Sequence, residues 1–142
     1  MNIIVTSNPQ KEDLKVLSDG IKSYNQLYIP DNVVFEEDTK FAVFAKDDNG
    51  KVLGGIRACG YWNYCILELL WLSEKTRGLG VGSKLIQAFE KFAANKGFNY
   101  VRTETISFQA RPFYEKLGYT VYGELPNYPK GHTTYCLYKE LK

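Results

Sequence analysis

One segment narrows the possible folds of this chain more than any other: residues 63–72 have the sequence NYCILELLWL. Apolar residues occupy both faces of this segment, which is typical of a central strand that is covered on both sides. A few residues later comes a glycine-rich turn, RGLGVGSK, at 77–84. From Ser83 to Lys96 apolar residues recur at helical spacing, and Gly97 ends the predicted helix. A strand, a glycine turn and a helix in this order predict an α/β domain.

Strand and helix patterns continue on both sides of this unit. The chain is predicted to begin with a strand at 2–7, followed by a helix that has Ser7 as its N-cap and ends near Tyr28. A second helix pattern covers 110–117. Further strands are predicted at 41–46 and 51–59, joined by a turn at Asn49-Gly50, and at 100–106, 119–125 and 133–138. This order predicts one mixed α/β domain over residues 1–142, with a sheet of seven strands flanked by helices.

Composition excludes several classes of protein. The 142 residues carry a net charge of +2 with scattered basic side chains, which does not indicate nucleic-acid binding. Three cysteines (Cys59, Cys65 and Cys136) and a single histidine predict neither a disulfide framework nor a metal site. The N-terminus lacks the pattern of a signal peptide, and no apolar run is as long as a membrane span. We therefore expect a soluble cytoplasmic protein without a membrane partner.

The glycine turn can be compared with three phosphate-binding patterns by counting residues. A P-loop, GxxxxGK[ST], that starts at Gly78 requires a glycine where the chain has Ser83. A dinucleotide-binding GxGxxG motif that starts at Gly78 and Gly80 also requires a glycine at that position. The third pattern, [QR]xxGx[GA], is matched by Arg77, Gly80 and Gly82. A glycine turn before a helix N-terminus offers unpaired N–H groups to an anion.

With this turn the chain resembles the GNAT N-acetyltransferases, whose [QR]xxGx[GA] loop binds the pyrophosphate of acetyl-CoA. Residues 68–86 (ELLWLSEKTRGLGVGSKLI) are similar to motif A of that family, and residues 107–119 (SFQARPFYEKLGY) are similar to its motif B. The resemblance implies the GNAT fold, in which a mostly antiparallel sheet is splayed between its fourth and fifth strands. It also implies acetyl-CoA as the acetyl donor and no metal.

The resemblance implies two groups of contacts with acetyl-CoA. The backbone N–H groups of the turn are expected to bind the pyrophosphate, and they belong to Arg77, Gly78, Leu79, Gly80, Val81, Gly82 and Ser83. The end of the central strand (Leu70, Trp71 and Leu72) is expected to pair with the pantetheine arm, with the Leu70 N–H polarising the acetyl carbonyl. Ser107 stands where many relatives carry an asparagine that holds the coenzyme, so Ser107 or Gln109 is expected to make that contact.

Two residues are candidates for the proton transfers. Tyr114 matches the family tyrosine that lies beside the thiol sulfur and donates a proton as the thiolate leaves. Glu68 is a carboxylate within the apolar central strand, and such a group is costly unless it is paired or faces water. It shares strand parity with Leu70 and therefore could face the acetyl group as a general base. Alternatively, Glu68 forms an ion pair with Arg57 or Arg102 and bulk water accepts the proton.

The acceptor is expected to be a primary amine, attacked in a ternary complex without an acetylated enzyme. Aromatic residues at the first helix and in the hairpins are the candidates for acceptor binding: Tyr24, Tyr61, Trp62 and Tyr128, with His132 nearby in a structural role. A small-molecule amine is favoured over a protein lysine or N-terminus. A regulatory module that binds acetyl-CoA without catalysis is a further alternative, and a homodimer remains open.

Overall fold

The computed structural model describes residues 1–29 and 39–142. The chain divides into two units, residues 1–34 and 35–142, and each is described by itself. In its described residues, 1–29, the first unit contains one helix, α1 (Lys11–Gln26). The described residues of the second unit, 39–142, contain six strands and two α-helices, with a 3-10 turn, η1 (Glu74–Thr76), before the first of these helices. That the chain functions as one domain over 1–142 stays a prediction.

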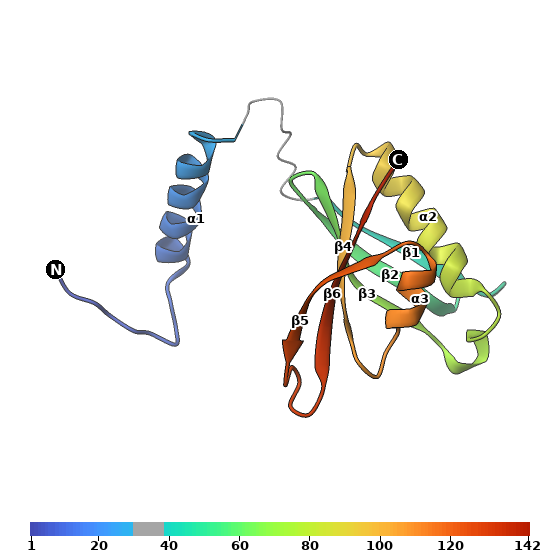
Figure 1. The fold of residues 1–142 in the computed structure, drawn as a ribbon. Coiled ribbons are helices and arrows are strands. Elements are labelled where there is room, and N and C mark those ends of the chain that lie inside the picture. Colours follow the sequence, from blue (N-terminus) through green and yellow to red (C-terminus); the bar gives the residue numbers. More distant parts are fainter. Residues whose placement is uncertain (30–38) are drawn as a thin grey trace. The chain divides into compact units, whose positions relative to one another are not determined.

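The strands of the second unit form a single sheet in the order β1-β2-β3-β4-β6-β5. Only β3 and β4 run parallel, and every other neighbouring pair is antiparallel. Helices α2 (Val81–Asn95) and α3 (Arg111–Lys116) lie on the same face of the sheet (Figure 1). The strands are β1 (Lys40–Lys46), β2 (Val52–Tyr61), β3 (Tyr64–Leu72), β4 (Tyr100–Ile106), β5 (Thr120–Pro126) and β6 (Thr133–Glu140). The predicted mixed and mostly antiparallel α/β architecture is therefore confirmed.

The N-terminal segment differs from its prediction. Residues 1–6 form no strand, so the described residues contain six strands where seven were expected. An apolar segment becomes a strand only when a neighbour pairs with its N–H and C=O groups, and none does so here. Helix α1 also begins later than expected, with Gln10 rather than Ser7 as its N-cap residue and without a side-chain cap.

Strands β3 and β4 separate partway along their length. They pair from Tyr64 opposite Tyr100 to Leu67 opposite Thr103, and no pairs follow. Beyond this point β3 remains paired with β2, and β4 remains paired with β6. We call this separation the fork. It is the predicted splay between the fourth and fifth strands, which are β3 and β4 once the expected N-terminal strand is counted.

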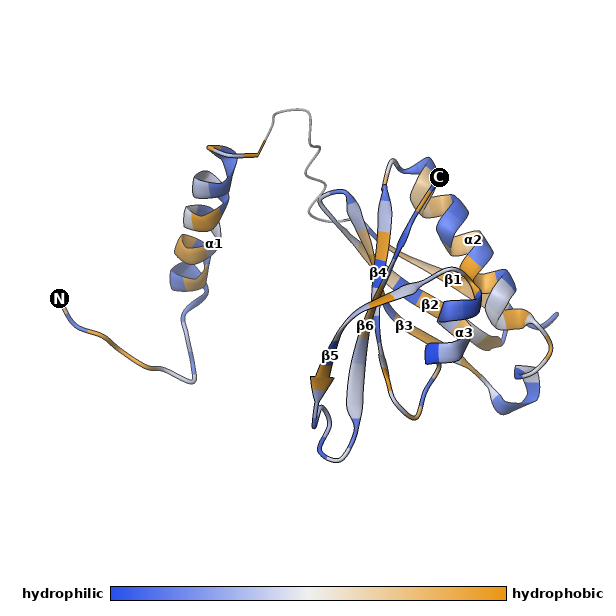
Figure 2. Cartoon of the chain, in the orientation of Figure 1, coloured by the Kyte–Doolittle hydropathy of each residue, from blue (hydrophilic) through white to orange (hydrophobic). Residues whose placement is uncertain are grey.

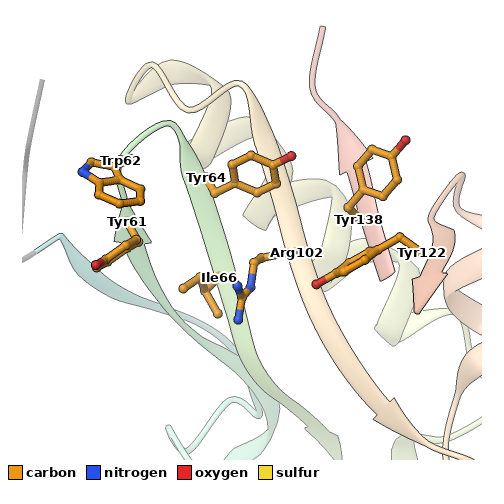
Figure 3. A pocket seen from close by; sticks show the side chains of 7 residues that line it. All are labelled: Tyr61, Trp62, Tyr64, Ile66, Arg102, Tyr122 and Tyr138. Atoms are coloured by element: carbon orange, nitrogen blue, oxygen red, sulfur yellow. The ribbon is translucent and has the colours of Figure 1, made fainter. Parts of the chain in front are cut away.

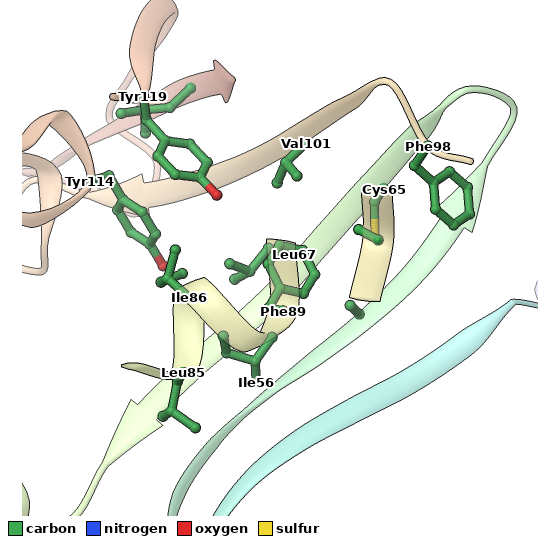
Figure 4. Packing of buried hydrophobic residues seen from close by; sticks show 13 residues of the cluster. Ile56, Cys65, Leu67, Leu85, Ile86, Phe89, Phe98, Val101, Tyr114 and Tyr119 are labelled. Carbon is green, nitrogen blue, oxygen red and sulfur yellow. The ribbon is translucent and has the colours of Figure 1, made fainter. Parts of the chain in front are cut away.

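The hydrophobic core lies between the sheet and the two helices that cover it. The apolar face of α2 contributes Leu85, Ile86 and Phe89 to this core, whereas its other face is hydrophilic (Figure 2). Leu137 of β6 also belongs to this core. Val101 meets these side chains from β4, and Tyr114 and Tyr119 close the core near α3 (Figure 4). The core therefore fixes α2 against β1, β2 and β3, on one side of the fork, and α3 beside β5, on the other side.

Phe89 is expected to be a major contributor to stability. Its side chain is fully buried and stacks on Phe41 with ring centroids 5.7 Å apart. We expect Phe89→Ala to lower the free energy of unfolding by about 3–5 kcal/mol, measured by urea denaturation, because it leaves a large cavity. Phe92 also contacts Phe41, with ring centroids 4.5 Å apart, but is 40% exposed. Phe92→Ala should cost less than half as much, and equal costs would contradict this account.

Candidate active site

A cavity of about 170 Å³ occupies the fork. Its walls come from β3, from β4 and from the start of α3, and we call it the fork cavity. It is lined by Leu67, Glu68, Leu69, Leu70, Thr103, Glu104, Thr105, Gln109, Ala110 and Tyr114. The structure therefore brings together four of the predicted site residues, namely Glu68, Leu70, Gln109 and Tyr114, whereas Trp71 and Leu72 do not line this cavity.

The glycine turn adopts the left-handed backbone that its sequence suggests. Gly78 has φ +75° and Gly80 has φ +78°, a region that L side chains rarely adopt. A Cβ at either position would lie in open space, so the turn leaves room for a ligand to approach the backbone. Helix α2 begins directly after Gly80, at Val81, two residues earlier than the predicted start at Ser83, and it has no side-chain cap. The first N–H groups of a helix have no partner within the helix, an arrangement that favours an anion, and pyrophosphate binding here stays a prediction.

Gly82 has a different reason to be glycine. A Cβ at this position would come within 3.1 Å of Cζ of Phe113 and 3.5 Å of Cδ1 of Leu72. The missing side chain therefore lets α2 approach α3 and the end of β3. Arg77 also supports this end of β3, because its Nε donates a hydrogen bond to the Leu72 carbonyl at 3.1 Å. The glycine turn is thus anchored to the strand that borders the fork cavity.

Tyr114 lies deep in the site. It is 4% exposed, and its ring meets that of Tyr119 edge to face with centroids 5.4 Å apart (Figure 4). Burial raises the pKa of the Tyr114 hydroxyl to about 12, and a hydrogen bond with Thr103 opposes this rise in part. At neutral pH the phenol therefore keeps its proton, which is the state that a general acid requires.

Glu68 occupies a β-bulge in β3. Leu67 pairs with Ala58 and Leu69 pairs with Arg57, so Glu68 has no partner in register. The bulge reverses the alternation of side chains: Leu67 faces the core before it, and Leu70 faces the core after it. The expectation that Glu68 faces the same side as Leu70 by parity is therefore wrong.

The Glu68 carboxylate is held toward β2. Its Oε2 accepts a hydrogen bond from Nε of Arg57 at 3.1 Å. Burial raises the pKa of the Cys59 thiol, and a hydrogen bond with Glu68 raises it further. Of the two predicted ion-pair partners of Glu68, Arg57 and Arg102, the structure therefore shows Arg57. Glu68 nevertheless borders the fork cavity, and its role as a base stays a prediction.

The comparisons with known proteins agree with this geometry. The model of the acetyltransferase (GNAT) family matches residues 11–119. This chain belongs to the GNAT family. A blasticidin-S acetyltransferase of Streptomyces morookaense is 36% identical over 102 residues, which cover 71% of this chain and 75% of that protein. The chain is therefore an N-acetyltransferase.

Solved structures of GNAT enzymes match nearly the whole chain. The crystal structure of an acetyltransferase from Bacillus cereus ATCC 14579 has a TM-score of 0.86 and 29% identity, covering 97% of this chain and 98% of that one. The fold also matches an aminoglycoside 6'-N-acetyltransferase that was solved in complex with coenzyme A. That match has a TM-score of 0.66 and 21% identity, over 100% of this chain and 98% of the other.

Ser107 and Gln109 of this GNAT enzyme both have structural partners. Oγ of Ser107 accepts a hydrogen bond from the Thr133 N–H at 3.2 Å, which ties the loop before α3 to β6. Oε1 of Gln109 accepts one from the Ile106 N–H at 2.8 Å, at the end of β4. Gln109 lines the fork cavity, whereas Ser107 does not. Their contacts with the coenzyme stay predictions.

Tyr61 and Trp62 lie at the other end of β3 from the fork. They line a second cavity, of about 410 Å³, together with Tyr64, Ile66, Arg102, Tyr122 and Tyr138 (Figure 3). Six residues of extended strand separate Tyr64 from Leu70, which corresponds to roughly 20 Å. The structure therefore does not bring these two aromatic residues to the fork cavity. Their role in acceptor binding stays a prediction.

The remaining acceptor candidates are spread over the chain. Tyr128 is exposed in the β5–β6 hairpin, and the His132 ring packs edge to face against Phe108 with centroids 4.8 Å apart. Tyr24 lies on α1 with its ring beside that of Tyr28, in the unit that is described by itself. None of these three lines the fork cavity, and their predicted roles are untested.

Several residues of the fork cavity were not predicted from the sequence. Thr103, Glu104 and Thr105 lie on β4, where the sequence shows ordinary strand alternation and no family motif. The pairing of β3 with β4 is the signal that would have identified them, because it places Thr103 opposite Leu67. Thr103 Oγ1 donates a hydrogen bond to the Leu67 carbonyl at 2.9 Å, at the last pair between the two strands.

At positions 1–29 and 39–142, no three His, Cys, Asp or Glu side chains gather in a way that could hold a metal ion. Within the same ranges, no helix has both the length and the apolar character needed to cross a membrane.

Two buried protonated side chains, Tyr114 and Cys65, are expected to make the folded state less stable at alkaline pH. Burial raises the pKa of Tyr114 from 10.0 to about 12, and burial together with the charge of Cys59 raises that of Cys65 from 9.0 to about 12. The folded chain therefore holds these protons more tightly than the unfolded chain, so stability is complete below pH 9 and falls as the pH rises toward 12. Urea unfolding at pH 8, 9.5 and 11 should show this fall, and an unchanged free energy at pH 11 would exclude it.

Proposed function

We propose that this chain transfers the acetyl group of acetyl-CoA to a primary amine of a small molecule, by direct attack in a ternary complex. The observation that carries the proposal is the position of Tyr114. Its protonated hydroxyl is buried beside a cavity between two strands, and a glycine turn with a helix N-terminus follows one of those strands. A thioester in this cavity would have an acid for its leaving sulfur and an anion site for the rest of the donor.

The chain offers the groups that the donor needs. The N–H groups of Val81, Gly82 and Ser83 form the first turn of α2, and the positive end of the helix dipole favours a pyrophosphate there. The open space at Gly78 and Gly80 lets that group approach the backbone. The aminoglycoside acetyltransferase, which has the same fold, was solved in complex with coenzyme A, and this supports acetyl-CoA as the donor.

Each protein group acts on a different part of the reaction. The amine nitrogen forms a bond to the acetyl carbon while the bond from carbon to sulfur breaks. Tyr114 donates its proton to the leaving sulfur. Negative charge grows on the carbonyl oxygen during attack, and the backbone N–H of Leu70 is the proposed donor to that oxygen. No cysteine lines the fork cavity among the described residues, which supports direct transfer without an acetyl-enzyme.

A small molecule is the acceptor that the comparisons favour. The relative that is 36% identical is named for acting on blasticidin S, and a structural neighbour is named for acting on aminoglycosides. Two competing outcomes remain: acetylation of a protein lysine or N-terminus, and regulatory binding of acetyl-CoA without turnover.

The test is an acceptor screen with acetyl-CoA. Release of free thiol is followed with a thiol reagent, and each product is identified by the mass of one added acetyl group. The panel contains blasticidin S, an aminoglycoside, a polyamine and lysine-containing peptides. Turnover of a small amine supports the proposal. Turnover of peptides alone would overturn the small-molecule assignment, and tight coenzyme A binding without any turnover would favour the regulatory module.

A further inference from the structure

The fork cavity contains two carboxylates, Glu68 on β3 and Glu104 on β4. An ammonium group must lose a proton before its nitrogen can attack a thioester, so the identity of the base decides the acceptor chemistry. The two carboxylates have different surroundings, and the difference follows from the strand order. Strand β3 lies between β2 and β4, so a side chain on β3 can turn toward either neighbour.

Glu68 lines the fork cavity, but its carboxylate is already paired. Its carboxylate binds Nε of Arg57, and Arg57 belongs to β2, on the side of β3 that is opposite to β4. Its contact with Cys59 is also with β2. An ammonium group that bound Glu68 would have to compete with a guanidinium that is already in place. Glu68 therefore acts first as a structural anchor for the bulge.

Glu104 is placed differently. It is the first residue of β4 after the last pair with β3, which is Thr103 opposite Leu67. Thr103 and Thr105 are buried on the face that α2 and α3 cover, so strand alternation puts Glu104 on the other face, where it is exposed. Within residues 1–29 and 39–142 the Glu104 carboxylate has no hydrogen bond and no ion pair. It is therefore available to a ligand.

The charged and titratable neighbours of Glu104 come from three strands. Burial raises the pKa of Cys136 on β6, and the charge of Glu104 raises it further while Arg102 opposes the rise. Burial also raises the pKa of Tyr122 on β5, Arg102 lowers it, and Glu104 raises it further. Glu68 faces the same cavity from β3. Among these groups only Arg102 is cationic, and it shares the open face with Glu104.

We propose that Glu104 is the catalytic residue that binds the ammonium group of the acceptor and takes its first proton; this inference rests on the proposed function. Tyr114 approaches the cavity from the face that carries α2 and α3, and Glu104 approaches from the opposite face. A thioester between them loses its sulfur toward Tyr114 and receives the nitrogen from the side of Glu104. The acid thus lies beside the leaving sulfur, and the base lies beside the incoming nitrogen.

The proton balance is complete with these two residues and solvent. The ammonium and the thioester become an amide, a thiol and one released proton. Glu104 accepts the proton that leaves the ammonium before attack and passes it to solvent. The nitrogen loses a second proton once the bond to carbon has formed, and this proton replaces, through solvent, the one that Tyr114 gives to sulfur.

The test compares Glu104→Gln with Glu68→Gln, using an acceptor that the wild-type enzyme turns over. Glu104→Gln should lower kcat/KM for the acceptor by about 100-fold or more, since a positioned base contributes on that scale. The KM for acetyl-CoA should stay within about threefold, as expected when a change removes no donor contact. Glu140→Gln, at the far end of β6 opposite Tyr100, is the matched control and should leave activity unchanged.

The pH profile separates a base from a merely structural carboxylate. In Glu104→Gln, kcat/KM should increase with pH in proportion to the free amine, because the protein no longer accepts the proton. Glu68→Gln should retain the wild-type profile. The inference would be overturned if kcat/KM of Glu104→Gln stayed within about threefold of wild type. It would also be overturned if Glu68→Gln, and not Glu104→Gln, showed the large loss of kcat/KM. Either result requires an active wild-type enzyme, so it differs from a failure of the proposed function, in which the wild type acetylates no amine.

Discussion

Tyr114→Phe is expected to lower kcat by roughly 10²- to 10³-fold, because general acid catalysis contributes on that scale. The substitution removes only the hydroxyl from a ring that is almost completely buried. The hydroxyl is protonated at neutral pH, since burial raises its pKa to about 12. Without it the thiolate must leave unprotonated. The measurement is steady-state kinetics with saturating acetyl-CoA, and the KM for acetyl-CoA should change little.

Tyr119→Phe is the matched control for this experiment. Tyr119 is also a buried tyrosine, and its ring touches that of Tyr114. Its hydroxyl, however, donates a hydrogen bond to Oε1 of Glu90 at 3.3 Å, away from the fork cavity. Tyr119→Phe should therefore affect stability more than kcat. Equal losses of kcat in the two variants would show that Tyr114 acts through packing and has no role as an acid.

Gly80→Val is expected to raise the KM for acetyl-CoA by about tenfold or more, which corresponds to at least ~1.4 kcal/mol of binding free energy. The side chain would fill the space that the structure leaves open beside the N-terminus of α2. It would also strain the backbone, because Gly80 has φ +78° and such a conformation costs a larger residue about 1–3 kcal/mol. Both effects act on the proposed pyrophosphate site.

Gly50→Val separates these two effects. Gly50 has φ +84° in the turn between β1 and β2, and a Cβ there also meets nothing within 4 Å. This variant carries the same type of strain but lies outside the glycine turn. Both variants should lose similar stability in urea, while only Gly80→Val should bind acetyl-CoA weakly. An unchanged KM in Gly80→Val would exclude the turn as the pyrophosphate site.

Much of the fold was predictable because its signals are local. The alternation of strand and helix patterns identified all six strands of the sheet, and Asn49-Gly50 correctly predicted the first hairpin. The glycine turn and the helix after it follow from residue types whose backbone preferences do not depend on the rest of the chain. The predicted N-terminal strand failed because a strand needs a partner, and pairing cannot be read from one segment.

The active site was predictable only in part. Tyr114, which the structure places in the fork cavity, and the glycine turn before α2 were predicted because each belongs to a short motif with fixed spacing, and their roles stay predictions. Glu68 was assigned to the wrong face, since strand parity holds only when no residue is inserted, and the bulge becomes visible only in the register with β2. Glu104 has no motif and was not identified at all.

The sequence by itself determined the family of this protein, the position of the glycine turn and the tyrosine of motif B that lines the fork cavity, because all three depend on neighbouring residues. The tertiary structure alone decided where β3 and β4 separate, which carboxylate Arg57 binds and which one stays open to an acceptor. The physical reason is that these properties arise from contacts between strands that lie far apart in the chain, and pairing register sets the face on which each side chain lies.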